Sequence, residues 1–230
     1  SHLNHRPEAL TDPNEFRTTR LYTTEMDKLY RSRLPLMKAI YNHYRGSARH
    51  KSNSHLMQRD GFQMLWEHAG IVGYETGFSV REINVIYCWS RMLWHDEMRN
   101  QHLVESMTFV DFLEAVGRAA DFLSPPDPTT LAGMMYQTTA FFKPETSKFG
   151  ITYEYFTLLS RNRGVSDKAL ELQRRPSAGF STPKTRPLHE KVGQLLDWMV
   201  GGLAKTHHVQ SEGELVHKLC MQARYNTKKG

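Results

Sequence analysis

Histidine side chains are the first candidates for chemistry in this chain, because the sequence carries 12 of them. A zinc hydrolase needs two histidines four residues apart on a helix, with a glutamate between them, so that both imidazoles and the base face one ion. The histidines here do not follow that spacing, including His43, His50, His55, His68 and the His207-His208 pair. We therefore interpret most of them as surface or loop residues, and the sequence predicts no bound metal.

The sequence also lacks the short glycine patterns of several large enzyme classes. It contains no Gly-x-x-x-x-Gly-Lys phosphate loop, no Gly-x-Gly-x-x-Gly dinucleotide turn and no Gly-x-Ser-x-Gly nucleophile elbow. Cys88 and Cys220 stand in apolar helical patterns, which argues against a disulfide framework and favours a reducing compartment. Although catalytic groups can assemble from distant positions, we predict that the protein is not an enzyme and needs no cofactor.

Charge is divided unevenly along the chain, although the total is only +6. Residues 1–53 hold ten Lys and Arg against five Asp and Glu, residues 54–130 hold five against eleven, and residues 131–230 hold fifteen against eight. Two explanations of this pattern are equally good. Solvated helix faces can simply vary in the sign of their charge, or the basic ends can bind a polyanionic partner. The candidate partner-binding residues belong to these basic ends: Arg6, Arg17, Arg20, Arg174, Arg175, Lys184 and Arg186.

Two segments with the same internal layout occupy the first half of the chain. After Met107, apolar residues recur at three- and four-residue spacing through Leu123, which predicts a helix with one buried stripe. The stretch after Met57 repeats this layout fifty residues earlier, with Phe62 aligned on Phe112. We expect a duplicated unit of helix, loop, one short extended residue and helix, with Met57 and Met107 side by side. The alternative to a duplication is a chance alignment, because all amphipathic helices share the same spacing of apolar residues.

The helices that enter the two units are also visible in the sequence. An apolar stripe with Ile40-Tyr41 follows Pro35, which either kinks a helix beginning at Thr24 or begins a second one. A capping box, Ser79-Val80-Arg81-Glu82, begins a helix that carries Ile86-Tyr87. Each unit is therefore expected to have an entering helix with the same Ile-Tyr pair.

Together these features resemble the degenerate EF-hand pairs of ciliary and flagellar proteins. The resemblance covers residues 24–124 and rests on the two Ile-Tyr helices, on Met57 and Met107, and on the Phe112-Leu113-Glu114-Ala115 segment. It implies a degenerate paired EF-hand-like helical domain. Together with the helical patterns that follow residue 124, this predicts an all-α fold in which a smaller helical C-terminal lobe follows that domain. The resemblance also implies protein partners such as tubulin or other axonemal proteins, and a cytoplasmic, cytoskeletal location in a cilium or flagellum.

The calcium chemistry of such a hand can be checked against the residues. A competent loop places oxygens at positions 1, 3, 5, 7 and 9, a glycine at 6 and a bidentate carboxylate at 12. With position 8 on Met107, Val104 stands at 5 and Asp111 at 12. With position 8 on Met57, none of the ligand positions holds a carboxylate and Gly61 stands at 12. We predict no calcium binding in the usual geometry, so that the paired hands serve as a packing scaffold.

The second loop still carries acidic residues. Asp96, Glu97 and Glu105 are close enough in sequence to approach a cation in a nonstandard way. Three solvated acids on a loop are the simpler interpretation, and we expect that one.

Proline-rich breaks divide the rest of the chain. Residues 1–23 have the composition of an extended basic arm, and the prolines of residues 124–129 separate the paired unit (24–124) from an aromatic helical hairpin (125–164). Residues 165–187 have a linker composition, and residues 188–230 are expected to form a C-terminal helical hairpin with a basic tail. Within the linker, Arg174-Arg175-Pro176-Ser177 resembles a basophilic kinase recognition sequence, so Ser177 is a candidate phosphorylation site. The aromatic hairpin suits either a small core against the second hand or a surface for a partner helix.

Three functional classes remain after these exclusions. No run of eighteen apolar residues and no secretory signal is visible, so we expect no association with a membrane. The first class is a non-catalytic structural or interaction protein of the axoneme or of microtubules, bound through its basic flanking regions. The second is a calcium- or phosphorylation-regulated adaptor. The third is a nucleic-acid-binding protein, which a pI of about 9.3 suggests but the scattered Lys and Arg disfavour.

Overall fold

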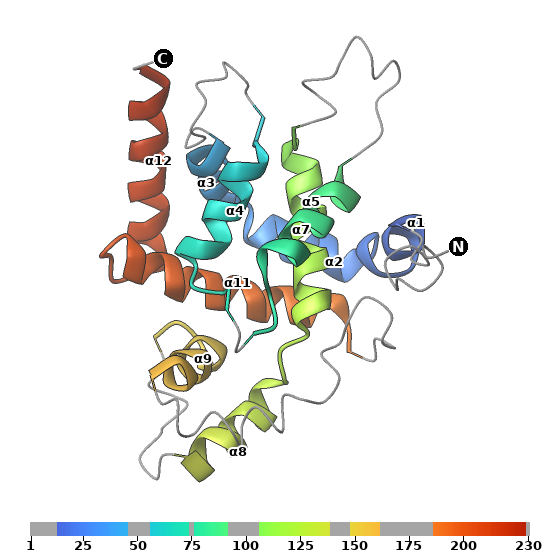
Figure 1. The fold of residues 1–230 in the computed structure, drawn as a ribbon, viewed down its shortest axis with the longest axis vertical. Helices are drawn as coiled ribbons and strands as arrows, with labels where there is room; N and C mark the ends of the chain where they lie inside the picture. Colours follow the sequence, from blue (N-terminus) through green and yellow to red (C-terminus); the bar gives the residue numbers. More distant parts are fainter. Residues whose placement is uncertain are drawn as a thin grey trace.

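The chain is helical throughout the part that can be described. The computed structural model describes residues 13–45, 56–73, 76–91, 106–138, 148–161 and 186–228, which contain no strand and two isolated antiparallel bridges (Figure 1). The all-α class is thus confirmed for these residues. The elements are α1 (Pro13–Phe16), the π-helix η3 (Arg17–Leu21), α2 (Thr24–Ser32), α3 (Leu34–Arg45), α4 (Arg59–His68), α5 (Val80–Ser90), α7 (Phe109–Leu123), α8 (Pro128–Thr138), α9 (Ile151–Arg161), α11 (Leu188–Thr206) and α12 (Glu212–Lys228).

Local sequence signals set the ends of several helices. The predicted capping box forms at the start of α5, where Glu82 accepts from the Ser79 amide at 3.0 Å. Thr108 and Asp111 form the same reciprocal pair at the start of α7. Pro35 lies in the first turn of α3, so it begins a second helix and does not kink a single one.

The two predicted units face each other through their short extended residues. α3 leads through Met57 into α4, and α5 leads through Met107 into α7. Met57 and Met107 form an antiparallel bridge in which each amide donates to the other carbonyl at 2.9 Å. The predicted side-by-side placement of these two residues is therefore confirmed.

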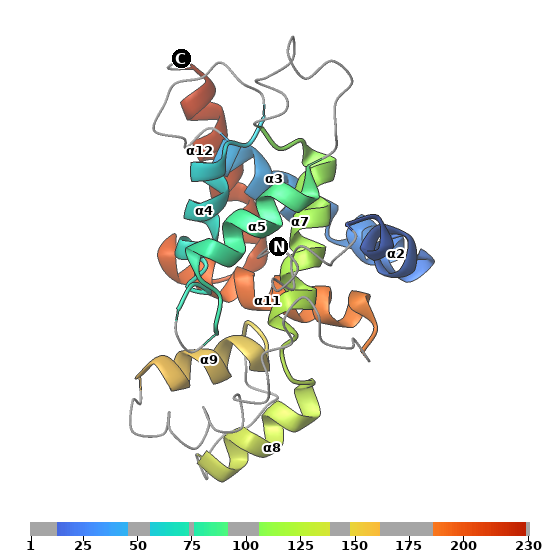
Figure 2. The same ribbon diagram turned by 45° about the vertical axis from the view of Figure 1, so that its right-hand side comes forward.

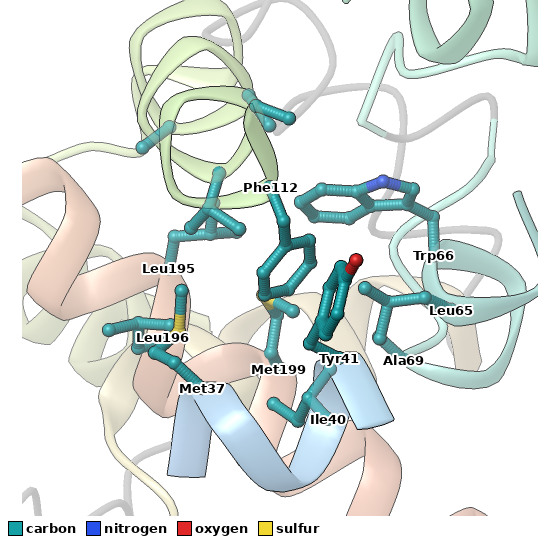
Figure 3. Packing of buried hydrophobic residues seen from close by; sticks show 14 of the residues in the cluster. Met37, Ile40, Tyr41, Leu65, Trp66, Ala69, Phe112, Leu195, Leu196 and Met199 are labelled. Atoms are coloured by element: carbon teal, nitrogen blue, oxygen red, sulfur yellow. The ribbon is translucent and has the colours of Figure 1, made fainter. Parts of the chain in front are cut away.

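The long helix α11 belongs to the main core, which corrects the expectation of a separate C-terminal lobe. Figure 1 shows α11 crossing beneath α3, α4 and α7, and Figure 2 shows the same arrangement after a 45° turn. Close up, Leu195 and Met199 of α11 lie among Met37, Tyr41 and Phe112 (Figure 3). Buried apolar residues of α2, α3, α4, α5, α7, α11 and α12 form one continuous cluster. Sequence periodicity shows that α11 has a buried stripe but not which helices cover it, and this is why the prediction was wrong.

The last helix also departs from the expected hairpin with α11. α12 packs most extensively against α3, where Leu215 and Leu219 join the main core. The short connection between α11 and α12 favoured an antiparallel pair of these two helices. Because α11 runs across the units, the apolar face of α3 remains available, and α12 packs on it. The C-terminal residues therefore complete the core of the first unit.

The aromatic hairpin forms a small core, and its described residues pack mainly on α11 instead of the second unit. Phe156 of α9 stacks on Trp198 of α11, with ring centroids 4.0 Å apart and an interplanar angle of 5°. α8 packs against α9 through Leu131, Met135 and Leu159. Three further aromatic side chains of the hairpin lie outside the described residues, those of Tyr136, Phe141 and Phe142.

The N-terminal residues that can be described are helical, which corrects the extended arm. Pro13–Phe16 form an α-helical turn and Arg17–Leu21 a π-helical turn. Leu21 is buried, and a Cβ added at Gly117 of α7 would lie 3.1 Å from its Cδ1. The polar composition of this segment hides these apolar contacts, because they depend on α7.

Candidate functional site

Two tyrosine hydroxyls bind the bridge between the units in a crossed manner. Tyr41 of α3 donates to the Met107 carbonyl at 2.9 Å, and Tyr87 of α5 donates to the Met57 carbonyl at 3.0 Å. Each entering helix therefore holds the bridge residue of the other unit. Burial raises the pKa of Tyr41 to about 12 and also raises the pKa of Tyr87, so both phenols remain protonated donors near neutral pH.

Ring contacts repeat the crossed arrangement. The Tyr41 ring centroid lies 5.7 Å from that of Phe112, and the Tyr87 ring centroid lies 5.6 Å from that of Phe62. Each tyrosine ring is also covered by the guanidinium of the arginine four residues further along, at 5.9 Å in the first unit and 5.2 Å in the second. Equivalent residues thus make equivalent contacts in both units, which supports the duplication.

Helix α11 covers the apolar faces of both units, and two glycines allow its close approach. A Cβ added at Gly202 would lie 1.8 Å from the Ala69 carbonyl oxygen, at the end of α4. A Cβ added at Gly201 would lie 2.4 Å from the ring of Tyr153 in α9. Interior glycines weaken a helix, yet α11 continues past this pair to Thr206. The pair lets the backbone at the end of α4 and the Tyr153 ring of α9 both lie directly against α11.

Three of the predicted partner-binding residues can be placed, and all three contact the chain itself. Arg17 Nε donates to Glu114 at 2.8 Å, Arg20 Nη2 donates to Asp121 at 2.9 Å, and Arg186 donates to the Pro125 carbonyl at 2.6 Å. The basic arm does meet an acidic surface, but that surface belongs to α7 of the same molecule. The remaining candidates lie outside the described residues: Arg6, Arg174, Arg175, Lys184 and the phosphorylation candidate Ser177.

Glu114 and Asp121, the carboxylates that pair with Arg17 and Arg20, are buried and form further ion pairs within the core. Glu114 also pairs with Arg118, one turn along α7, at 2.8 Å. Asp121 also pairs with Lys191 of α11 at 3.0 Å, and the Lys191 side chain is only 2% exposed. Burial lowers the pKa of Lys191, while the Asp121 carboxylate acts in the opposite sense. Removing either carboxylate would therefore leave a buried cation without its main partner.

Histidines gather where α3, α4 and the end of α11 meet. The His207 ring centroid lies 5.3 Å from that of His43 and 6.4 Å from that of His68. Burial, reinforced by the neighbouring imidazoles, lowers the pKa of His43 to about 4, and burial also lowers the pKa of His207. Tyr44 Oη lies 3.0 Å from His68 Nδ1, and Lys218 donates to the His207 carbonyl at 2.6 Å. The sequence interpretation of surface histidines is thus wrong for His43 and His207, which are buried.

Metal binding has no candidate in the part of the chain that can be described. Within residues 13–45, 56–73, 76–91, 106–138, 148–161 and 186–228, no group of three His, Cys, Asp or Glu side chains is placed to hold an ion. Asp111, at loop position 12 of the second unit, accepts from the Thr108 amide and hydroxyl at 2.9 and 2.8 Å. A Cβ added at Gly61, the equivalent position of the first unit, would lie 2.3 Å from the Tyr44 carbonyl oxygen. The expected loop acids Asp96, Glu97 and Glu105 lie outside the described residues.

The buried charges of α7 do not follow from its apolar periodicity. Their signal in the sequence is spacing, because Glu114, Arg118 and Asp121 stand at i, i+4 and i+7 on one helical face. A charged helical face normally indicates contact with water. Only the placement of the N-terminal residues over this face shows that it is buried.

Two further observations concern the class of protein. None of the helices in the described ranges combines the length and the apolar character needed to cross a membrane. Comparison of the chain with models of known protein families, with curated proteins and with solved structures found no match.

Proposed function

We propose that this protein is a non-catalytic structural and interaction protein, built on a degenerate pair of EF-hand-like units that acts as a rigid helical block. The observation that carries the proposal is the Met57–Met107 bridge with its crossed bonds from Tyr41 and Tyr87. A pair of helix–loop–helix units joined by one short backbone bridge is the arrangement expected of such hands. Buried, fully hydrogen-bonded bridges of this kind favour rigidity.

The cover provided by α11 supports a static role for the pair. A calcium sensor works by opening an apolar surface that then receives a target helix. Here the corresponding apolar faces already pack on α11, and the contact of Gly202 with Ala69 leaves no space for even one methyl group. Asp111 and Gly61 serve a helix cap and a helix–helix contact. These features favour a scaffold over a switch.

We propose an acidic cytoskeletal polymer, such as the microtubules of an axoneme, as the partner. The support is the excess of Lys and Arg at both ends of the sequence and the resemblance to flagellar proteins. Because Arg17, Arg20 and Arg186 have contacts within the chain, the docking role passes to the remaining basic candidates Arg6, Arg174, Arg175 and Lys184. Attraction of this kind is long-ranged and weakened by salt.

Microtubule co-sedimentation tests the proposal. We expect the protein to pellet with microtubules at low salt in the presence of a calcium chelator, and to pellet less at higher salt. The double substitution Arg174→Glu and Arg175→Glu should weaken pelleting. A matched control, Lys28→Glu with Lys38→Glu, makes the same charge change at two exposed sites and should have a smaller effect.

Three outcomes would contradict this assignment. A requirement for calcium would favour a calcium-regulated adaptor instead. Retardation of DNA or RNA without binding to microtubules would favour a nucleic-acid-binding protein. Equal losses in the test and control variants would show that total charge, and not residues 174–175, determines binding.

A further inference from the structure

The face of α7 beneath the N-terminal residues has the features of a recognition surface. We call residues 13–21 the strap, and we call Glu114, Gly117, Arg118 and Asp121 of α7 the seam. The seam residues stand at i, i+3, i+4 and i+7, so they share one face of the helix. All four are buried with the strap in place.

Four strap side chains make the contacts. Arg17 and Arg20 reach the two seam carboxylates at 2.8 and 2.9 Å. The ring of Phe16 lies beneath the Arg118 guanidinium, 4.4 Å from its centroid. Leu21 is buried in the main core. Recognition therefore depends on two charges, one aromatic ring and one aliphatic side chain.

Gly117 provides the space for the strap. A Cβ at this position would lie 3.1 Å from Leu21 Cδ1 and 3.7 Å from Phe16 Cζ in the strap, and 3.4 Å from the Tyr30 hydroxyl in α2. An interior glycine weakens a helix compared with alanine. Its presence in the middle of α7 fits the close packing of both the strap and the Tyr30 side chain of α2 on this face.

The seam does not depend on the strap for its charge balance. Glu114 Oε1 is held by Arg118, which leaves Oε2 for Arg17. Asp121 retains Lys191 of α11 when Arg20 is removed. Both carboxylates therefore keep an ion-pair partner when the strap leaves. Removal of an ordinary core element would instead leave a buried charge unpaired.

The connection to the rest of the chain is also compatible with release. The strap joins α2 through Tyr22, which is 63% exposed, and Thr23, which has extended backbone. Thr23 caps α2 by accepting from the Met26 amide, a contact within the α2 end itself. The side-chain cap of α2 is therefore independent of the strap, and the Thr23 amide donates to the Leu21 carbonyl of the strap at 2.9 Å.

We propose that the seam is a docking site for a short basic helical segment of a separate partner protein, and that the strap occupies this site when the partner is absent. The segment would carry an aromatic residue followed directly by arginine, with arginine and leucine four and five residues after the ring. The chemistry follows from the acceptors that face the strap, which include Glu114 Oε2, Asp121 Oδ1 and the carbonyl oxygens of Trp89 and Arg186. This inference goes beyond the proposed function and does not depend on the cytoskeletal partner.

The test uses a fluorescent peptide with the sequence Pro13–Thr23 and the full chain. An open variant, Arg17→Glu with Arg20→Glu, removes the strap as a competitor but leaves the seam unchanged. A tethered segment acts at an effective concentration of roughly 1 mM, so a peptide with Kd of about 0.1 mM should bind the open variant about tenfold more tightly than the wild type. A peptide with both arginines changed to glutamate should bind neither protein.

Two further variants locate the site. Gly117→Leu in the open background fills the space beneath Phe16 and Leu21 and should abolish peptide binding while the variant still unfolds cooperatively in urea, which would show that the nearby Tyr30 of α2 accommodates the leucine. The matched control Lys28→Glu with Lys38→Glu, which makes the same charge change away from the seam, should behave like the wild type. Binding unchanged by Gly117→Leu would overturn the placement on α7.

The proposal fails if a cooperatively folded open variant binds the peptide no more tightly than the wild type does. If the open variant does not fold, Phe16→Ala loosens the strap without a charge change and should give a smaller gain, and no gain would overturn the proposal. Sedimentation velocity of the wild type tests whether a second copy of this chain occupies the seam. Concentration-dependent self-association that the open variant loses would identify a second copy of this chain, and would overturn a separate partner.

Discussion

Replacing Tyr41 and Tyr87 with phenylalanine tests whether the crossed bridge stabilises the molecule. Each change removes a hydroxyl donor from a buried bond, of 2.9 Å in one unit and 3.0 Å in the other, and leaves the ring contacts in place. The acceptor carbonyls keep their bonds from the Met57 and Met107 amides. Each loss should therefore equal the net value of one hydrogen bond, about 1 kcal/mol in the free energy of unfolding.

Equivalence of the two units makes a stronger prediction than either loss alone. We expect the two single variants to agree within about 0.5 kcal/mol, and the double variant to lose at least the sum because both bonds stabilise one bridge. Urea unfolding would measure these losses as lower midpoints with an unchanged dependence on urea. Tyr22→Phe, at an exposed ring, is the control and should change little. A loss confined to one of the two tyrosines would refute the crossed equivalence, and no loss in either would refute the stabilising role of the bridge.

Three other properties can be predicted from the structure. Gly202→Ala should unfold the protein or lower its stability by about 3 kcal/mol, because a Cβ there meets the Ala69 carbonyl. Gly213→Ala in α12 meets no neighbour and should raise stability by about 0.5–1 kcal/mol. Equal shifts in the thermal unfolding midpoints of the two variants would contradict this. The pKa of His43 is about 4 in the folded protein against an ordinary 6.5, so the unfolded chain binds more protons between these two pH values. The free energy of unfolding should therefore be retained above pH 6.5 and fall by about 3 kcal/mol as the pH drops to 4. His43→Gln should flatten this part of the pH profile, measured by urea unfolding. Isothermal titration with Ca²⁺ at 1 mM should give no stoichiometric heat, and uptake of one or two ions would overturn the degenerate-hand assignment.

The sequence by itself determined most of the local structure, because local structure depends on neighbouring residues. The capping box at Ser79 and Glu82 and the buried stripe after Met107 appear where expected, and Pro35 begins a second helix, which was one of the two alternatives. Short-range hydrogen bonds and apolar periodicity specify these features within one or two turns. The fifty-residue repeat also placed Met57 beside Met107, since equivalent positions in a duplicated unit make equivalent contacts.

The sequence pattern indicated which residues were alike but not which groups they would meet. Tyr41 and Tyr87 were visible as a repeated Ile-Tyr pair, yet their hydroxyls bond across the units to carbonyls of the other bridge residue. Backbone acceptors have no residue-type signal, so no pattern of side chains points to them. The candidate site was therefore half visible from the sequence.

Only the tertiary structure decided the partners of the charged residues and of the last two helices. Arg17 and Glu114 are 97 residues apart, and a charged helical face looks the same in sequence whether water or a strap covers it. The apolar stripe of α11 likewise specifies that one face is buried but not that two helical units cover it. Burial and ion pairing are properties of contacts between distant segments, and such contacts exist only once the helices have packed.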